Sequence, residues 1–156
     1  MPRGIKNVLL ESAKELNPDL GYILGVMKGD GFLSKAGRSG CSFLVGLNTI
    51  DKDFVLEFKS RIEKVFKVPT SLYYFKPVKQ WRFYFTSKEI GIFLKNFDIK
   101  KVLNASSNGK ATFLRGLFDS EGSVSAYNLD ELKRAERRIT FVNKDKKLVK
   151  LVKDLL

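Results

Sequence analysis

Apolar residues recur at helical spacing in six segments of the chain. The pattern predicts helices over residues 5–16, 18–29, 49–66, 87–97, 108–122 and 144–156. Asn17, Pro18 and Asp19 form a typical helix start, because Asn17 can cap free N–H groups and proline fits the first turn. Ser87 and Asn108 are the expected N-caps of two later helices.

The segments between these helices have the composition and alternation of strands. Residues 31–48 read as two strands joined by a basic, glycine-containing loop at 36–40, and 70–87 as a hairpin turning at 77–79. After the helix at 108–122 the order begins again, with strands at 123–127 and 136–142. Asp30 lies 91 residues before Glu121, and Asp51 lies 94 residues before Asp145, so the two offsets nearly agree. They indicate an internal duplication with a pseudo-two-fold arrangement.

The composition narrows the class of partner. The 156 residues are 44% hydrophobic, which is ordinary for a globular chain, and the net charge of +12 favours a polyanion such as nucleic acid or an acidic membrane surface. No apolar run approaches the roughly 18 residues that a membrane span needs, and the N-terminus lacks the apolar core of a signal peptide. We expect a protein that stays inside the cell and has no membrane partner, in the cytoplasm and associated with the nucleoid or, alternatively, in an organelle.

The chain has no histidine and a single cysteine. This excludes histidine-based triads, histidine–metal nucleases, zinc fingers and intrachain disulfides. Any hydrolytic chemistry must therefore depend on carboxylates, lysines and metal ions bound by oxygen.

Two nonapeptides carry acids at corresponding places, "ILGVMKGDG" at 23–31 and "LRGLFDSEG" at 114–122. With the strand signals that follow each, they resemble the paired motifs of the LAGLIDADG homing endonucleases, in particular the small single-chain archaeal type. The resemblance covers most of the chain, from Leu20 to Leu156. It implies an α+β fold of two αββαββα half-domains, packed through the motif helices and carrying antiparallel DNA-binding sheets. The halves would be residues 1–109, with an N-terminal helix and a linker, and residues 110–156.

The chemistry agrees with the resemblance. Gly25 and Gly116 are small enough for two helices to touch, which would bring Asp30 and Glu121 together at one end. Two adjacent carboxylates repel unless they share divalent cations. Mg²⁺ suits such an oxygen site, and Mn²⁺ or Ca²⁺ can occupy it too. The expected metal-site residues are Asp30, Glu121, Gly29 and Ser120.

The resemblance also implies further catalytic residues. A polar side chain at the end of the second strand of each repeat would order water, which points to Asn48 and Asn143. Lys144 would supply positive charge to the transition state, whereas Thr49 occupies the corresponding position in the first repeat. Asp119 is interpreted as a helix-end or salt-bridging residue. Val124 stands where some relatives carry lysine.

Each half of such a protein would lay its sheet in the major groove of DNA. Alternation in "WRFYFT" (81–86) assigns Trp81, Phe83 and Phe85 to the core and Arg82, Tyr84 and Thr86 to the DNA face. Arg82 is the expected base reader, since its planar fork matches guanine. The expected DNA-binding residues are Lys35, Arg38, Lys76, Lys79, Arg82, Tyr84, Arg134, Arg137 and Arg138.

The second repeat departs from the first in length. Only 35 residues follow Glu121, against 78 from Asp30 to Asn108, so we expect it to lack its second hairpin and last helix. The leading prediction is an intron-encoded, Mg²⁺-dependent endonuclease that cuts both strands of a long duplex DNA site, monomeric if complete and dimeric if truncated. The alternatives are an RNA-splicing maturase that binds intron RNA, a degenerate nucleic-acid-binding protein, and a basic domain that only joins protein assemblies.

Overall fold

The computed structural model describes residues 16–37, 42–129 and 134–156, and for 126–129 and 134–137 it describes the strands but not the side chains. The predicted helix at 5–16 and the predicted DNA contact Arg38 lie outside the described residues, except for Leu16. Within the described ranges, no helix is both long and apolar enough to cross a membrane.

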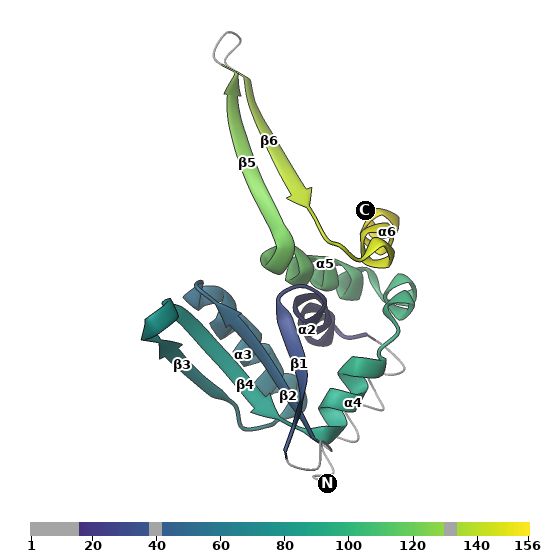
Figure 1. The fold of residues 1–156 in the computed structure, drawn as a ribbon. Helices are drawn as coiled ribbons and strands as arrows, with labels where there is room; N and C mark the ends of the chain where they lie inside the picture. Colours follow the sequence, from purple (N-terminus) through teal and green to yellow (C-terminus); the bar gives the residue numbers. More distant parts are fainter. Residues whose placement is uncertain (1–15, 38–41, 130–133) are drawn as a thin grey trace.

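The order of elements confirms an α+β fold (Figure 1). The first half consists of α2 (Pro18–Lys28), β1 (Gly31–Ala36), β2 (Ser42–Thr49), α3 (Lys52–Phe66), β3 (Ser71–Phe75), the 3₁₀ turn η1 (Lys76–Val78), β4 (Gln80–Thr86) and α4 (Lys88–Asn96). A 3₁₀ segment, η2 (Ile99–Asn104), leads to α5 (Ser107–Glu121), β5 (Gly122–Leu129), β6 (Arg134–Phe141) and α6 (Lys146–Leu155).

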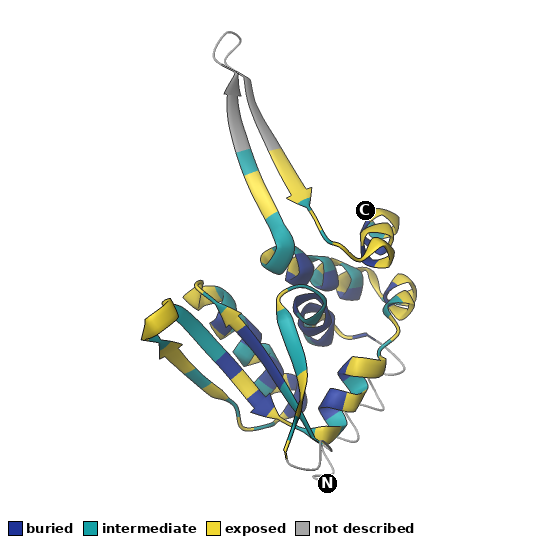
Figure 2. Ribbon diagram, in the orientation of Figure 1, coloured by how far each residue is buried: buried dark blue, intermediate teal, exposed yellow. Residues whose placement is uncertain are grey.

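The two halves carry unequal antiparallel sheets. The first sheet has four strands in the order β1-β2-β4-β3, and the second, within the described residues, is the two-stranded ribbon β5-β6. One face of the four-stranded sheet packs on helices, where the rings of Phe58 in α3 and Phe83 in β4 meet edge to face at 5.3 Å. Figure 2 shows burial concentrated in α2, α3, α5 and the central strands, whereas the β5-β6 ribbon projects away from the other elements.

The helices α2 and α5 lie side by side at the centre of the molecule (Figure 1). A Cβ atom added to Gly25 would lie 2.2 Å from the carbonyl oxygen of Phe113, and one added to Gly116 would lie 2.3 Å from that of Tyr22. Both distances are shorter than any contact that a side chain tolerates. The predicted backbone-to-backbone approach of the motif helices is therefore confirmed.

Two of the three predicted N-caps are confirmed, whereas the predicted helices at 49–66 and 144–156 begin later, at Lys52 and Lys146. The side chains of Asn17 and Ser87 cap α2 and α4 as predicted. The N-cap of α5 is Ser106 and not Asn108, because Ser106 has a non-helical backbone and its hydroxyl accepts the N–H of Gly109 at 3.2 Å. Asn108 already lies within the first turn of the helix.

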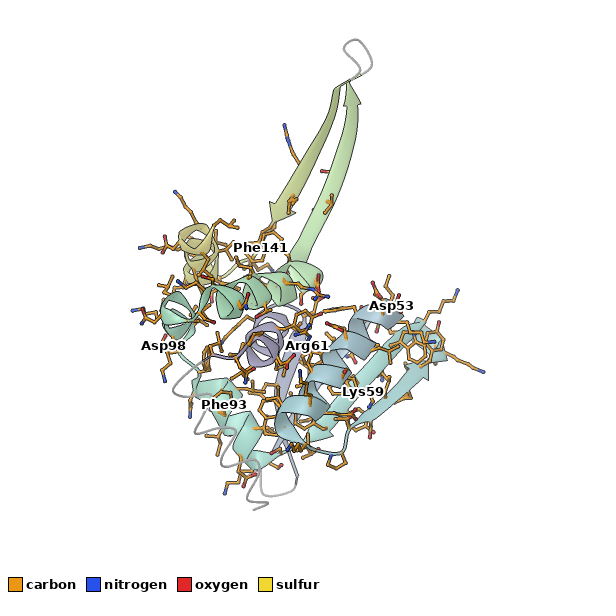
Figure 3. All side chains as sticks on the ribbon, turned by 180° about the vertical axis from the view of Figure 1, so that it is seen from behind. Asp53, Lys59, Arg61, Phe93, Asp98 and Phe141 are labelled. Carbon is orange, nitrogen blue, oxygen red and sulfur yellow. The ribbon has the colours of Figure 1, made fainter. Side chains whose placement is uncertain are left out.

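The β5-β6 ribbon is longer than the predicted strands at 123–127 and 136–142. At its base Phe141 packs against Phe118 of α5, with the ring centroids 5.5 Å apart (Figure 3). The next residues on the same face, Val124 and Ile139, form a cross-strand pair and are 74% and 71% exposed. An apolar face of the second sheet is thus left uncovered.

The contact between the motif helices predicts a stability effect. Gly116→Val should lower the free energy of unfolding by about 3 kcal/mol or more, because its side chain would force α2 and α5 apart. Ala111→Val adds bulk to an exposed position of the same helix and should cost less than about 1 kcal/mol. Urea unfolding followed by circular dichroism measures both, and equal losses would contradict the account.

Candidate active site

Asp30 is placed by the end of α2. Gly29 is the C-cap, and its N–H donates to the carbonyl oxygens of Gly25 and Val26 at 3.2 and 3.1 Å. A Cβ atom on Gly29 would lie 2.5 Å from the Cβ of Ser120 and 3.1 Å from the Cγ of Glu121. The lower ends of the two helices therefore touch, with Asp30 and Glu121 adjacent to the contact.

The carboxyl group of Asp30 is without a partner in the described part of the chain. Among the described residues none gives it a hydrogen bond or an ion pair, and desolvation by the surrounding protein raises its pKa above the ordinary value although the residue is exposed. A partly desolvated carboxylate without a counter-charge favours a bound cation.

Glu121, the last residue of α5, has a partner. The side-chain amide of Asn143 donates to its Oε1 at 3.3 Å. The two residues line a shallow cavity of about 340 Å³ together with Val142 and Lys144. The predicted catalytic residues of the second repeat, Glu121, Asn143 and Lys144, thus share one cavity.

The ladder register corrects the expected equivalence of Asn48 with Asn143. Gly31 pairs with Leu47 in the first repeat and Gly122 with Phe141 in the second, so Asn143 corresponds to Thr49. The local hydrogen bonds agree: the Oγ1 of Thr49 accepts the N–H of Asp51 at 3.1 Å, and the Oδ1 of Asn143 accepts that of Asp145 at 2.8 Å. The counterpart of Asn48 is Val142, one residue earlier.

Asn48 lies at the exposed end of β2, directly across the ladder from Arg82. Both line a depression of about 240 Å³ on the open face of the four-stranded sheet. Because Asp30 precedes Gly31 and Asn48 follows its partner Leu47, the antiparallel ladder brings Asp30 and Asn48 to the same end of the sheet. The catalytic role of Asn48 stays a prediction.

The donor set suits a hard cation with few protein ligands. In the described part of the chain no group of three or more His, Cys, Asp or Glu side chains converges on one point. Two carboxylates fit Mg²⁺, Mn²⁺ or Ca²⁺ when water and phosphate oxygens complete the coordination. Gly29 and Ser120 set the spacing, and the hydroxyl of Ser120 donates back to the carbonyl oxygen of Gly116 at 3.0 Å.

Asp119 faces the flank of the helix pair, away from Glu121. It accepts a hydrogen bond from the buried phenol of Tyr22 at 2.9 Å, and burial together with this carboxylate raises the pKa of Tyr22. The guanidinium of Arg61 covers the Tyr22 ring at 4.5 Å and pairs with Asp19, between α3 and α2 (Figure 3). Tyr22 and Arg61 were not predicted, and only the i, i+4 spacing of Arg115 and Asp119 signalled a salt bridge here.

The open face of the first sheet has the predicted alternation in β4. Phe83 and Phe85 are buried and Trp81 packs against the core, whereas Tyr84 and Thr86 are exposed. The guanidinium of Arg82 lies 3.8 Å above the ring of Phe75.

The other predicted DNA contacts are dispersed. Lys76 and Lys79 are exposed in the β3–β4 turn. Lys35 is exposed too, but in the ladder it pairs with Phe43, whose ring packs on α4. Lys35 therefore lies on the face of the sheet that the helices cover, and not on the open face. Arg138 is exposed on β6, and Arg134 and Arg137 lie in β6 with side chains outside the description.

Comparisons with known proteins agree with this arrangement. The fold is similar to that of the homing endonuclease I-DmoI in complex with DNA and Mn, with a TM-score of 0.63 at 18% identity over 89% of this chain and 76% of that chain. It is also similar to the homing endonuclease I-WcaI bound to its DNA recognition sequence, with a TM-score of 0.51 at 16% identity over 99% and 74% of the two chains. The fold is thus that of these homing endonucleases.

Sequence comparison supports the same family. A family model of the LAGLIDADG-like domain matches residues 108–156. Two uncharacterized proteins of Methanocaldococcus jannaschii, MJ0314 and MJ0398, are each 30% identical, over 76% and 90% of this chain. The chain spans 48% of the length of each of these relatives. Residues 108–156 therefore match a LAGLIDADG-like domain, and the chain shares the fold of the homing endonuclease I-DmoI.

The raised pKa of Asp30 predicts how stability changes with pH. In the metal-free protein, Asp30 ionises less readily in the folded state than in the unfolded state. The free energy of unfolding therefore falls as pH rises from the ordinary carboxyl pKa through the raised pKa of Asp30. Asp30→Asn should therefore become more stable than the wild type above this window and lose that advantage below it. Asp53→Asn removes a favourable charge from the first turn of α3 and should destabilise at neutral pH. Urea unfolding over a pH series tests both signs.

Proposed function

We propose that this protein is a DNA endonuclease that uses divalent metal ions to cut both strands of a long duplex site. The observation that carries the proposal is the contact of Gly29 with Ser120 and Glu121, which puts Asp30 and Glu121 at one end of the paired motif helices. The strands β1 and β5 leave from this same end, so a duplex lying on both sheets would pass over the two carboxylates.

Different residues of the chain would have different roles in the proposed reaction. Metal ions held by Asp30 and Glu121 would activate water and stabilise the leaving oxygen of the phosphodiester. Asn143 fixes the orientation of Glu121 through its 3.3 Å hydrogen bond. The exposed Lys144, which lines the same cavity, places positive charge beside the site of reaction.

The partner and the metal are supported by the similar structures. Those of I-DmoI include complexes with DNA in the presence of Mn, Ca and Mg. The net charge of +12 and the exposed cations of the first sheet suit a phosphate backbone. We propose Mg²⁺ as the working ion, duplex DNA as the substrate and the prokaryotic cytoplasm as the location.

A second candidate keeps the fold without cleavage. Within the described residues the second sheet has two strands against four in the first, and Val124 and Ile139 are exposed on it. A weakened second half would suit a binding-only protein or a maturase that recognises intron RNA. Competition separates these candidates, because a maturase should prefer structured intron RNA to any duplex DNA.

Cleavage should depend on both carboxylates. Asp30→Asn and Glu121→Gln should each lower the cleavage rate roughly 10³-fold, since a metal ion supplies several kcal/mol of transition-state stabilisation. Binding to DNA should persist in both variants. The substrate is a randomised duplex pool with Mg²⁺, from which cleaved ends are captured and sequenced.

The matched control is Asp119→Asn, a carboxylate two residues earlier on the same helix. It should keep cleavage and lose stability, because Asp119 accepts the buried phenol of Tyr22. Undiminished cleavage by Asp30→Asn would refute the site.

The salt dependence of binding tests the nucleic-acid role as such. For a protein making 6–10 phosphate contacts, affinity for duplex DNA should fall by about 10³- to 10⁵-fold between 50 and 200 mM salt. Fluorescence anisotropy with a labelled duplex measures this fall. An affinity that changes less than about threefold would favour a domain that only joins protein assemblies.

A further inference from the structure

We propose that Arg82, held in place by Phe75, determines one guanine of the DNA site through the open face of the first sheet. The inference rests on the proposed function, which supplies the duplex. To the predicted base reader Arg82 it adds a positioning residue, Phe75, that the sequence did not indicate.

Arg82 is held by stacking. Its guanidinium carbon lies 3.8 Å above the Phe75 ring, which is a close cation–π contact. Its Nε is buried, and among the described residues no acceptor makes a hydrogen bond or an ion pair with the side chain. The protein therefore orients the guanidinium, while no described acceptor binds it. Its outer N–H groups are available to a ligand.

The position within the sheet favours a base edge over a phosphate. β4 is an inner strand, between β2 and β3, and Arg82 sits in the middle of its row with Asn48 on one side and Tyr73 on the other. When a sheet enters the major groove, the centre of its face meets the base pairs, while its rim meets the phosphates. Lys76 and Lys79, in the β3–β4 turn, occupy the rim.

The surroundings limit what can be bound. The depression of about 240 Å³ around Arg82 is bordered by Tyr73 and Tyr84, whose rings meet edge to face at 6.2 Å. Both rings are partly exposed, at 42% and 37%. The two rings lie on either side of the guanidinium, so that only a planar ligand that enters edge first can reach it.

The chemistry selects guanine. A guanidinium carries only donors, and a fixed plane presents two of them in parallel. In the major groove guanine offers two acceptors, N7 and O6, whereas the other bases offer a donor or a single acceptor at this edge. A two-donor contact therefore excludes the other three bases at that position.

The experiment is selection of bound duplexes from a randomised library, with EDTA present so that no cleavage occurs. The wild type should enrich sites with guanine at one position, and Arg82→Lys, which keeps the charge but loses the fork, should reduce that preference by about tenfold or more at that position alone. Phe75→Leu should reduce the same preference by a smaller factor. Circular dichroism melting confirms that each variant is folded.

The control is Lys76→Gln, which removes a rim charge. It should weaken binding evenly across all sequences and make the salt dependence less steep. If Arg82→Lys keeps every base preference, or if Arg82→Gln behaves as Lys76→Gln does, Arg82 contacts phosphate and the inference is wrong while the proposed function stands. If the wild type enriches no duplex, the proposed function and the inference both fail.

Discussion

The close approach of α2 and α5 is the constraint on which the rest of the structure depends. Glycine at positions 25 and 116 lets two backbones meet at distances that no side chain permits. The hydrophobic residues around the contact are fully buried, among them Tyr22, Phe113 and Leu117. Because the acidic residues sit at the C-terminal ends of these same helices, packing and active-site geometry are fixed by one contact. A change in helix spacing would alter stability and the metal site together.

The two carboxylates at the end of the helix pair have different surroundings. Asp30 is a desolvated carboxylate without a described partner, whereas Glu121 is held by Asn143 beside Lys144. The flank of the pair carries a separate polar network around Tyr22, which ties α2 to α3 and α5. The acids of the second motif thus serve different purposes: Asp119 stabilises the helix packing, and Glu121 faces the proposed site of reaction.

Much of this could be predicted from sequence because the signals are local. Helical spacing, the Asn17 and Ser87 caps and the alternation of β4 are set by neighbours in the chain, and the structure agrees. Asn48 and Asn143 were matched by residue type, but the ladder register, which a polar pattern does not fix, makes Thr49 the counterpart of Asn143. The role of Tyr22 has no local sequence signal, because its hydrogen-bond partner Asp119 is 97 residues away.

The most direct test of the central claim is the position of Mn²⁺ in crystals of the protein, located by anomalous scattering. The account predicts peaks between the carboxylates of Asp30 and Glu121, at the end of the helix pair. Mn²⁺ bound only in the acidic depression of about 350 Å³ that includes Asp51, Asp53 and Asp119 would contradict it. That result would mean that the paired motif helices pack the protein without forming its metal site.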